Sequence, residues 1–193
     1  MKAGKAMLRI VCFGDSNTWG YDPYHEDRYP LDQIWPSLLE TEDKTIVNAG
    51  ECGRCACGSL PALQSVMTGF CDTLIIQLGV NDLRAGYSVD ETVVSVRILA
   101  EYALKHSSHV ILIAPLHVRP QAIESWGFSE SGPEDSDVLT EKMHGMAEEM
   151  HCLFVDPNDF TDAADLPSDG IHLTLEGHEL LAVHLKALLD QLS

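Results

Sequence analysis

Short apolar stretches alternate with longer amphipathic stretches along the chain. The short stretches are rich in β-branched and aliphatic residues and predict buried strands at 8–13, 44–48, 72–78, 109–114 and 151–155. The longer stretches predict helices near 32–42, 59–69, 88–106 and 137–149 and over the last 20 residues. This alternation is typical of a parallel sheet with helices on both faces, because crossover connections between parallel strands are right-handed.

The segment 88–106 gives the clearest helix prediction. Ser88 and Glu91 have the spacing of a capping box, and apolar residues recur on one face at Val89, Val93, Val96, Ala100 and Ala103. Neither an internal repeat nor a linker interrupts the pattern. The sequence therefore predicts one doubly wound domain over 1–193 with five strands.

Composition and charge narrow the function classes. The chain has 193 residues, 45% of them hydrophobic, which suffices for a core without disulfides or metal. Lys and Arg total 12 against 30 Asp and Glu, a formal charge of -18, so nucleic acids and anionic membrane surfaces are poor partners. A small local basic site would escape this argument. The longest apolar stretches are too short to span a bilayer.

The N-terminal segment and the cysteines indicate a cytoplasmic protein. Arg9 interrupts the first apolar stretch, and no small-residue cleavage site follows, so we expect a first strand rather than a signal peptide. Without other signs of secretion, the six cysteines do not predict a disulfide framework. Three of them are predicted to be small core residues: Cys12, Cys71 and Cys152.

Candidate chemistry follows the strands, since ligands bind at the carboxyl ends of the strands in such sheets. Polar, glycine-containing segments leave these ends at 14–30, 49–58, 79–87, 115–136 and 156–172. The first begins Gly14-Asp15-Ser16, a tight turn that would point a serine hydroxyl out of the sheet beside backbone N–H groups. The alternative is an ordinary turn in which Asp15 or Ser16 only caps a helix.

A serine nucleophile needs a base, and His172 has an acid at a fixed local spacing. Asp169, three residues earlier, would accept a hydrogen bond from Nδ1–H and leave Nε2 free to take the serine proton. The alternative is that Asp169 only begins a turn. The other histidines have no comparable partner and are predicted to be surface or helix-face residues: His25, His106, His109, His117, His144, His151, His178 and His184.

The third strand runs into Gly79-Val80-Asn81-Asp82. At a carboxyl end, the Asn81 side chain would donate to an oxyanion, or alternatively form an Asx-turn with its own backbone. The three motifs in this order are hard to explain by chance.

With these motifs the sequence resembles the SGNH hydrolases, the GDSL-type esterase superfamily, from the first strand to the final helix. The stretches 13–20, 79–82 and 169–172 are similar to its first, third and last blocks. The resemblance implies that Ser16 is the nucleophile, that Asn81 is an oxyanion-hole side chain, and that Asp169 and His172 are the acid and the base.

The second block is looser. By its spacing from Asn48, the resemblance assigns Gly53 as a backbone N–H donor of the oxyanion hole beside Ser16 and Asn81, with Gly50 as the alternative. The usual proline after the last-block histidine is absent, and Leu173 stands there, which concerns loop rigidity.

The resemblance also implies a flavodoxin-like, three-layer α/β/α sandwich with a five-stranded parallel sheet and no required cofactor. It implies attack of Ser16 on an ester carbonyl and release of the acyl group by water. The opening FGDSNTWGYDP looks most like small intracellular arylesterase and acyltransferase-type members, which act on short acyl esters and are often oligomeric.

Aromatic residues after the nucleophile suggest a small acyl pocket. We expect Trp19 and Tyr21 to line it, together with Tyr24, unless they only pack the 20–35 loop. The long segment 115–136, which contains Trp126, suggests a lid or a subunit contact, with His117 and Phe128 as its other marked residues. Acidic residues at 130–137 and 156–169 favour neutral over anionic substrates.

Rival hypotheses concern the same segments. Cys52, Cys55 and Cys57 have a spacing that suits Zn²⁺ or a redox-sensitive loop, but no second Cys or His pair matches, so no metal is predicted. The leading hypothesis is a serine esterase that acts on esters with a short acyl chain, in particular acetyl esters, of a small alcohol or carbohydrate. The alternatives are a thioesterase, a lysophospholipase, an acyltransferase, or a domain that binds acylated ligands without turnover.

Overall fold

The computed structural model describes residues 7–161 and 169–192. Within them, five parallel strands form one sheet: β1 (Leu8–Gly14), β4 (Lys44–Gly50), β5 (Cys71–Gln77), β6 (Ser107–Ile113) and β7 (Leu153–Val155). The order is β4-β1-β5-β6-β7, the flavodoxin-like arrangement. The predicted fold class is confirmed. Of the predicted 156–172 segment and its acidic residues, 162–168 lie outside the described residues.

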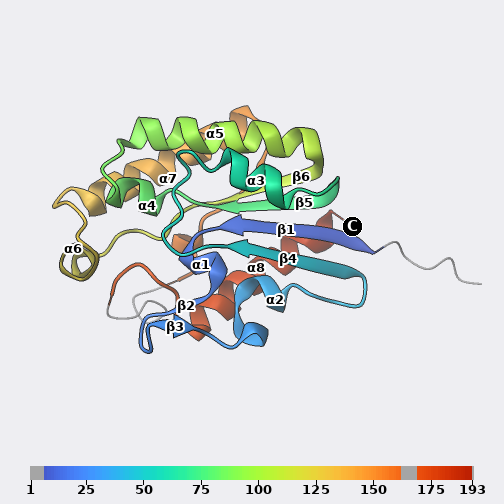
Figure 1. The fold of residues 1–193 in the computed structure, drawn as a ribbon, viewed down its shortest axis with the longest axis horizontal. Helices are drawn as coiled ribbons and strands as arrows, with labels where there is room; N and C mark the ends of the chain where they lie inside the picture. Colours follow the sequence, from blue (N-terminus) through green and yellow to red (C-terminus); the bar gives the residue numbers. More distant parts are fainter. Residues whose placement is uncertain (1–6, 162–168, 193) are drawn as a thin grey trace, which may run out of the picture.

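Helices cover both faces of the sheet. In chain order they are α1 (Ser16–Trp19), α2 (Trp35–Leu38), α3 (Leu60–Val66), α4 (Val80–Arg84), α5 (Val89–His106), α6 (Pro120–Trp126), α7 (Gly132–Glu149) and α8 (Leu175–Gln191). Figure 1 shows α3, α5 and α7 above the sheet and α2 and α8 below it. None of the helices in the described ranges has the length and apolar character that crossing a membrane requires.

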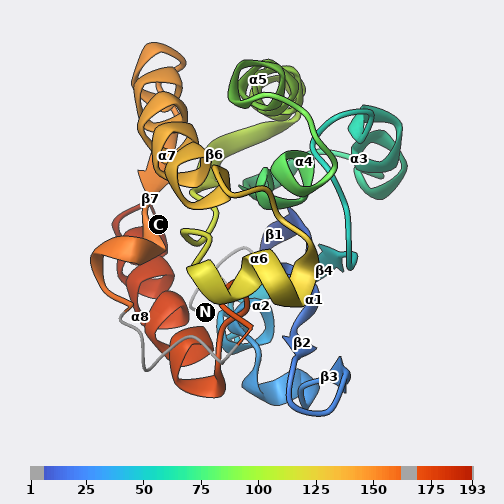
Figure 2. The same cartoon turned by 90° about the vertical axis from the view of Figure 1, so that its left-hand side faces the viewer.

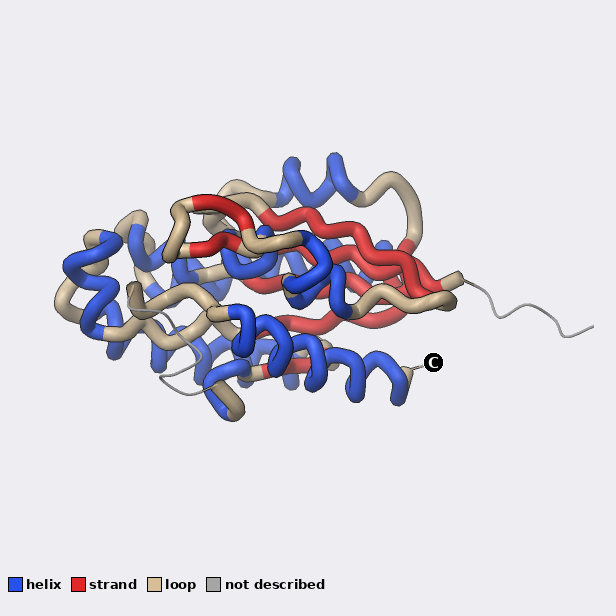
Figure 3. Tube along the Cα trace, turned by 90° about the horizontal axis from the view of Figure 1, so that it is seen from below, coloured by secondary structure: helices blue, strands red, loops and turns tan. Residues whose placement is uncertain are grey.

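Alternate residues of each strand feed two hydrophobic cores. Val11 and Phe13 of β1 point into the core between the sheet and helices α3, α5 and α7. Ile10 and Cys12 point into the core between the sheet and helices α2 and α8. The strands run side by side between these layers (Figure 3). Because both faces are buried, the strands read as continuous apolar runs, which is why they were readable in the sequence.

The helix predictions differ from the structure mainly at their ends. The capping box is present, with the Ser88 N–H donating to Glu91 Oε2 at 2.8 Å. The predicted helix 32–42 is instead a 3₁₀ turn (Leu31–Gln33) followed by the short α2. Helix α7 begins five residues early, at Gly132, because Pro133 in its first turn presets the backbone for a helix.

The pattern of apolar and polar residues did not predict the short elements at the carboxyl edge of the sheet. These are a two-stranded hairpin of β2 (Tyr21–Asp22) and β3 (Asp27–Arg28), a 3₁₀ turn at Pro157–Asp159, and helices α1, α4 and α6. Each is too short to show a hydrophobic period. Figure 2 looks onto this edge and shows α6 with α1 and α4 beside it.

Two histidine predictions are wrong. His178 is fully buried: its Nδ1 accepts the Trp35 N–H at 3.3 Å, and its ring stands edge-on to Tyr29. His25 does have a carboxylate partner, because its Nδ1 lies 2.6 Å from Asp22 Oδ2 with the same three-residue spacing as Asp169 and His172. The sequence pattern reports neither the burial of a helix face nor a turn within a hairpin.

The buried His178 predicts that acid destabilises the fold. Burial, with a smaller contribution from His172, lowers the pKa of His178 to about 3 from the 6.5 of an exposed histidine. Between these values the unfolded chain takes up a proton that the folded chain does not. The free energy of unfolding should therefore fall as pH drops from 6.5 towards 3, by at most about 1.4 kcal/mol per pH unit.

Urea unfolding of wild type and His178→Asn at pH 7 to 4 measures this contribution. The wild type should lose more stability with acid than the variant, because asparagine does not titrate. His184→Asn, on the exposed face of the same helix, is the matched control and should follow the wild type. A difference between wild type and His178→Asn that is independent of pH would contradict the prediction.

Candidate active site

The turn after β1 places Ser16 at the carboxyl edge of the sheet. Gly14 is required there, because a Cβ would meet Thr18 Oγ1 at 2.0 Å and the Gln77 carbonyl oxygen at 2.8 Å. Asp15 then caps α1 by accepting the Asn17 N–H at 3.0 Å. Burial raises the pKa of Asp15 to about 7. Ser16 is the first residue of α1, directly after this tight turn.

Ser16, His172 and Asp169 form a continuous hydrogen-bonded chain. Ser16 Oγ lies 2.8 Å from His172 Nε2, although the two residues are 156 positions apart. His172 Nδ1 lies 2.6 Å from Asp169 Oδ2. All three side chains are buried. Burial would raise the pKa of Asp169, but hydrogen bonds from the His172 ring and from backbone N–H groups outweigh it and hold this pKa below its usual range.

Asn17 joins the loop of His172 to the helix of Ser16. Its Nδ2 donates to the Ile171 carbonyl oxygen, and its Oδ1 accepts the Leu173 N–H, both at 2.9 Å. The loop is thereby fixed on both sides of His172. The proline that the resemblance to GDSL-type esterases led us to expect here has no N–H to donate, so Leu173 in its place supplies a hydrogen bond that proline cannot make.

The loop after β4 supplies the opposite side of the site. Gly50 packs against α1, because a Cβ there would meet the Trp19 backbone nitrogen at 2.2 Å, and its N–H donates to Asn48 Oδ1. Gly53, with φ +78°, lines the same pocket as Ser16 and Asn81. This geometry favours Gly53 over Gly50 as the backbone donor.

Asp82 and Arg54 hold this loop in place. The Asp82 carboxylate accepts the N–H groups of Ala56 at 2.7 Å and Cys57 at 2.8 Å. Arg54 donates to the Gly14 and Ala49 carbonyl oxygens and lies over the Phe13 ring. Burial raises the pKa of Asp82. Its carboxylate serves the loop rather than the pocket.

Asn81, one residue before Asp82, has its side chain at the pocket. Its Nδ2 donates one hydrogen to the Arg54 carbonyl oxygen at 3.2 Å, and the amide carries a second hydrogen. The Asn81 side chain is buried and lines the pocket beside Ser16 and Gly53. The Asx-turn alternative is not what its side chain forms.

The pocket has a volume of about 290 Å³. Its lining residues are Ser16, Tyr21, Cys52, Gly53, Asn81, Arg84, Trp126, Ile171 and His172. Tyr21 lies there as expected, with its ring 4.7 Å from the His172 ring. Trp19 and Tyr24 are not among the described lining residues: the Trp19 ring lies against the Arg28 guanidinium, and Tyr24 is 62% exposed. For these two aromatics the packing alternative fits better.

Sequence reasoning missed part of this lining. Arg84 lies three residues after Asn81 on α4, so the helical spacing was the available signal. Trp126 was noted only as part of the 115–136 segment, and its ring stands edge-on to His172 at 5.1 Å between centroids. Phe128 of that segment is buried, and His117 pairs with Asp137 instead. Helix α6 thus covers the histidine side of the pocket.

The six cysteines are spread over the two cores and the 52–57 loop. All six are free thiols, Cys12 and Cys71 are buried in the two cores, and the half-buried Cys152 packs against one of them. Within 7–161 and 169–192, no group of three or more His, Cys, Asp or Glu side chains is placed to hold a metal ion. Of the 52–57 cluster, only Cys52 lines the pocket described above.

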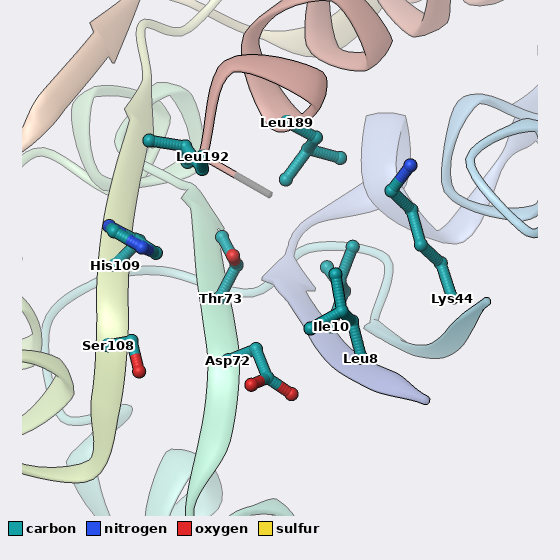
Figure 4. A pocket seen from close by; sticks show the side chains of 9 residues that line it. All are labelled: Leu8, Ile10, Lys44, Asp72, Thr73, Ser108, His109, Leu189 and Leu192. Atoms are coloured by element: carbon teal, nitrogen blue, oxygen red, sulfur yellow. The ribbon is translucent and has the colours of Figure 1, made fainter. Parts of the chain in front are cut away.

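A second hollow lies at the opposite, amino edge of the sheet (Figure 4). It has a volume of about 220 Å³ and is lined by residues near the starts of β1, β5 and β6. Its one lysine, Lys44, is ion-paired with Asp190 at 2.9 Å. Because this hollow lies at the amino ends of the strands, it is at the other end of the sheet from Ser16 and His172.

Comparison with known proteins places this geometry among related folds. The model of the GDSL-like lipase/acylhydrolase family matches residues 12–180. Among curated proteins, no sequence matches the chain.

Several solved structures share the fold. The M. smegmatis aryl esterase is 23% identical with a TM-score of 0.84, over 96% of this chain and 100% of that one. Est24, a carbohydrate acetylesterase from Sinorhizobium meliloti, is 24% identical with the same TM-score and coverage. A lipolytic protein of the G-D-S-L family from Veillonella parvula is 21% identical, with a TM-score of 0.75 over 94% and 96% of the two chains.

The Asn17 bridge predicts that removing its side chain loosens the His172 loop. In Asn17→Ala the buried Leu173 N–H loses its acceptor and the Ile171 carbonyl oxygen loses its donor. Amide hydrogen exchange in 171–173 should accelerate about tenfold or more, since an unsatisfied buried group costs about 1–3 kcal/mol. Hydrogen exchange followed by mass spectrometry measures this.

Asn158→Ala is the matched control. Asn158 also accepts an N–H, that of His117 at 2.8 Å, and donates to a carbonyl oxygen, that of Pro115 at 3.1 Å. Its loss should accelerate exchange near 117 and leave 171–173 unchanged. Unchanged exchange at 171–173 in Asn17→Ala would show that the bridge does not hold the loop.

Proposed function

The chain belongs to the GDSL-like lipase/acylhydrolase family and is a carboxylic ester hydrolase; we propose that it acts on short-chain esters through an acyl-Ser16 intermediate. The proposed substrates are acetyl esters of a small alcohol or carbohydrate. The observation that carries the proposal is the Ser16–His172–Asp169 chain, with distances of 2.8 and 2.6 Å, at the edge of a small pocket. A domain that only binds acylated ligands has no use for a base held on its serine.

In the first step, Ser16 Oγ attacks the ester carbonyl carbon while His172 Nε2 takes the hydroxyl proton. Asp169 accepts the Nδ1–H hydrogen bond and stabilises the imidazolium that forms. The carbonyl oxygen becomes an oxyanion, to which the N–H groups of Ser16 and Gly53 and the Asn81 amide donate. The imidazolium then protonates the leaving alkoxide, and the acyl group stays on Ser16.

In the second step, water attacks the acyl carbonyl carbon and gives its proton to His172. The same donors receive the second oxyanion. His172 returns the proton to Ser16 Oγ as the acid is released. The protein supplies base, orientation and oxyanion donors for both steps, so the reaction balances without a cofactor.

Pocket size supports a short acyl group. A volume of about 290 Å³ lies just below the usual range of ligand pockets, roughly 300–1,000 Å³. Tyr21 and Trp126 flank the His172 ring, so the departing alcohol would lie against aromatic surface, as flat or sugar-like alcohols do. A long-chain thioester or lysophospholipid would need an extended apolar channel.

The free thiols support the cytoplasm as the proposed location, because exposed cysteines such as Cys52 persist there in reduced form. The oligomeric state implied by the family resemblance stays a prediction that a mass measurement in solution would test.

Hydrolysis of p-nitrophenyl esters from acetyl to long chain tests the proposed function. Wild type should prefer the shortest acyl groups. Ser16→Ala should lose about 10⁴-fold or more in kcat, since the attacking atom is gone. Ser65→Ala, at an exposed serine of α3, is the matched control and should keep wild-type activity.

Two results would contradict the proposal. Equal activity of wild type and Ser16→Ala would exclude the serine mechanism. A maximum at long acyl chains would exclude the short-chain specificity and favour the lysophospholipase alternative.

A further inference from the structure

Arg84 brings an unpaired positive charge to the pocket. Its Nε donates to the Trp126 carbonyl oxygen at 2.8 Å, and its guanidinium lies 5.6 Å from the Trp126 ring centre. This leaves the two terminal nitrogens, Nη1 and Nη2, with their N–H donors. Among the described residues, no carboxylate lies within 4.0 Å of them.

The position of Arg84 relates it to the alcohol part of the ester. The leaving oxygen must lie near His172 Nε2 to be protonated, so the alcohol extends towards the residues that contact the His172 ring. Trp126 is one of them, and Arg84 is bonded to its carbonyl. Figure 2 shows their helices, α4 and α6, together at this edge of the sheet. Beside the pocket of Ser16, another open hollow of about 280 Å³ continues past Arg84 along Gly53 and Asn81.

Local charge here opposes the charge of the whole chain. The pocket of Ser16 and the hollow that continues from it have no described Asp or Glu in their lining, although the chain carries a formal charge of -18. A further hollow that Arg84 also lines, and that does not include Ser16, does contain Asp90, Glu91 and Asp135. Acidic residues farther than about 8 Å from a bound group are largely screened at physiological ionic strength, whereas a carboxylate in direct contact with the exposed Arg84 guanidinium lies well within this distance. At this point a direct contact with Arg84 therefore favours an anionic group, whereas the acidic residues at 130–137, of which Asp135 lines that further hollow, favour neutral esters.

We propose that Arg84 is a substrate-binding residue that selects esters whose alcohol part carries a carboxylate, that is, acetylated hydroxy acids or acidic sugars. This rests on the proposed function, because it assigns the alcohol to the histidine side of an acyl-Ser16 reaction. The planar guanidinium presents Nη1 and Nη2 side by side, which matches the two oxygens of a carboxylate. Anchoring the alcohol there holds the ester oxygen near His172.

Two pairs of esters isolate this contact. We would measure kcat/KM for 3- and 4-acetoxybenzoate and for the corresponding acetoxybenzamides, which have the same acyl group and nearly the same shape without the charge. Each value is divided by the rate of hydroxide-catalysed hydrolysis, which corrects for the different leaving groups. Wild type should prefer the carboxylates, and Arg84→Gln should lose about two- to fivefold on them, mainly through KM, because Arg84 is exposed.

The control variant is Arg28→Gln. Arg28 makes the same kind of contacts as Arg84: its Nε donates to the Trp19 carbonyl oxygen at 2.7 Å, and its guanidinium lies over the Trp19 ring. It does not line the pocket described here, so its loss should leave the preference unchanged. Arg84→Lys keeps the charge and should recover part of the preference lost in Arg84→Gln.

Each outcome separates this inference from the proposed function. If Arg84→Gln slows carboxylates and amides equally, Arg84 only positions Trp126, and the inference is overturned. If Arg84→Gln changes neither pair while Ser16→Ala abolishes both activities, the ester hydrolase stands and the carboxylate site does not. If wild type cleaves neither acetoxybenzoates nor simple acetate esters, the proposed function fails and the inference with it.

Discussion

The side chain of Asn17 connects the two ends of the fold at the site. It bonds to the backbone on both sides of His172, while its own backbone carbonyl accepts the Trp35 indole N–H at 3.0 Å. Trp35 in turn donates its backbone N–H to the buried His178 of the last helix. A turn after the first strand and a loop before the last helix are thus locked together, and the 2.8 Å contact of Ser16 with His172 depends on that lock.

The opposite wall depends on a buried carboxylate. Asp82 holds the loop of Gly53 by two backbone N–H groups, and Asn81 beside it reaches the pocket. One short helix, α4, therefore fixes the loop that carries the proposed backbone donor, presents the proposed side-chain donor, and ends in Arg84. Asn81 and Asp82 point to different sides because successive residues of a helix are rotated by about 100°. Asn81 and Arg84 lie on nearly the same side because three residues almost complete a helical turn.

Much of this arrangement was readable from the sequence, because the strands are buried on both faces and the site residues sit at fixed offsets from turns. Ser16 and the pair of Asp169 and His172 were found in this way, and the structure brings them together. Burial and side-chain direction were not readable. For that reason His178 was placed wrongly, Trp19 was expected at the pocket although it packs against Arg28, and Arg84 was overlooked.

The central claim is that Ser16 becomes acylated because His172 removes its proton. Its most direct test is labelling with a small p-nitrophenyl alkylphosphonate, followed by peptide mass spectrometry. We predict that each chain takes up one phosphonyl group, on Ser16, and that one equivalent of p-nitrophenol is released as it does so. Labelling should be much slower in His172→Ala. Labelling of another residue such as Cys52, or equal rates in wild type and His172→Ala, would contradict the account.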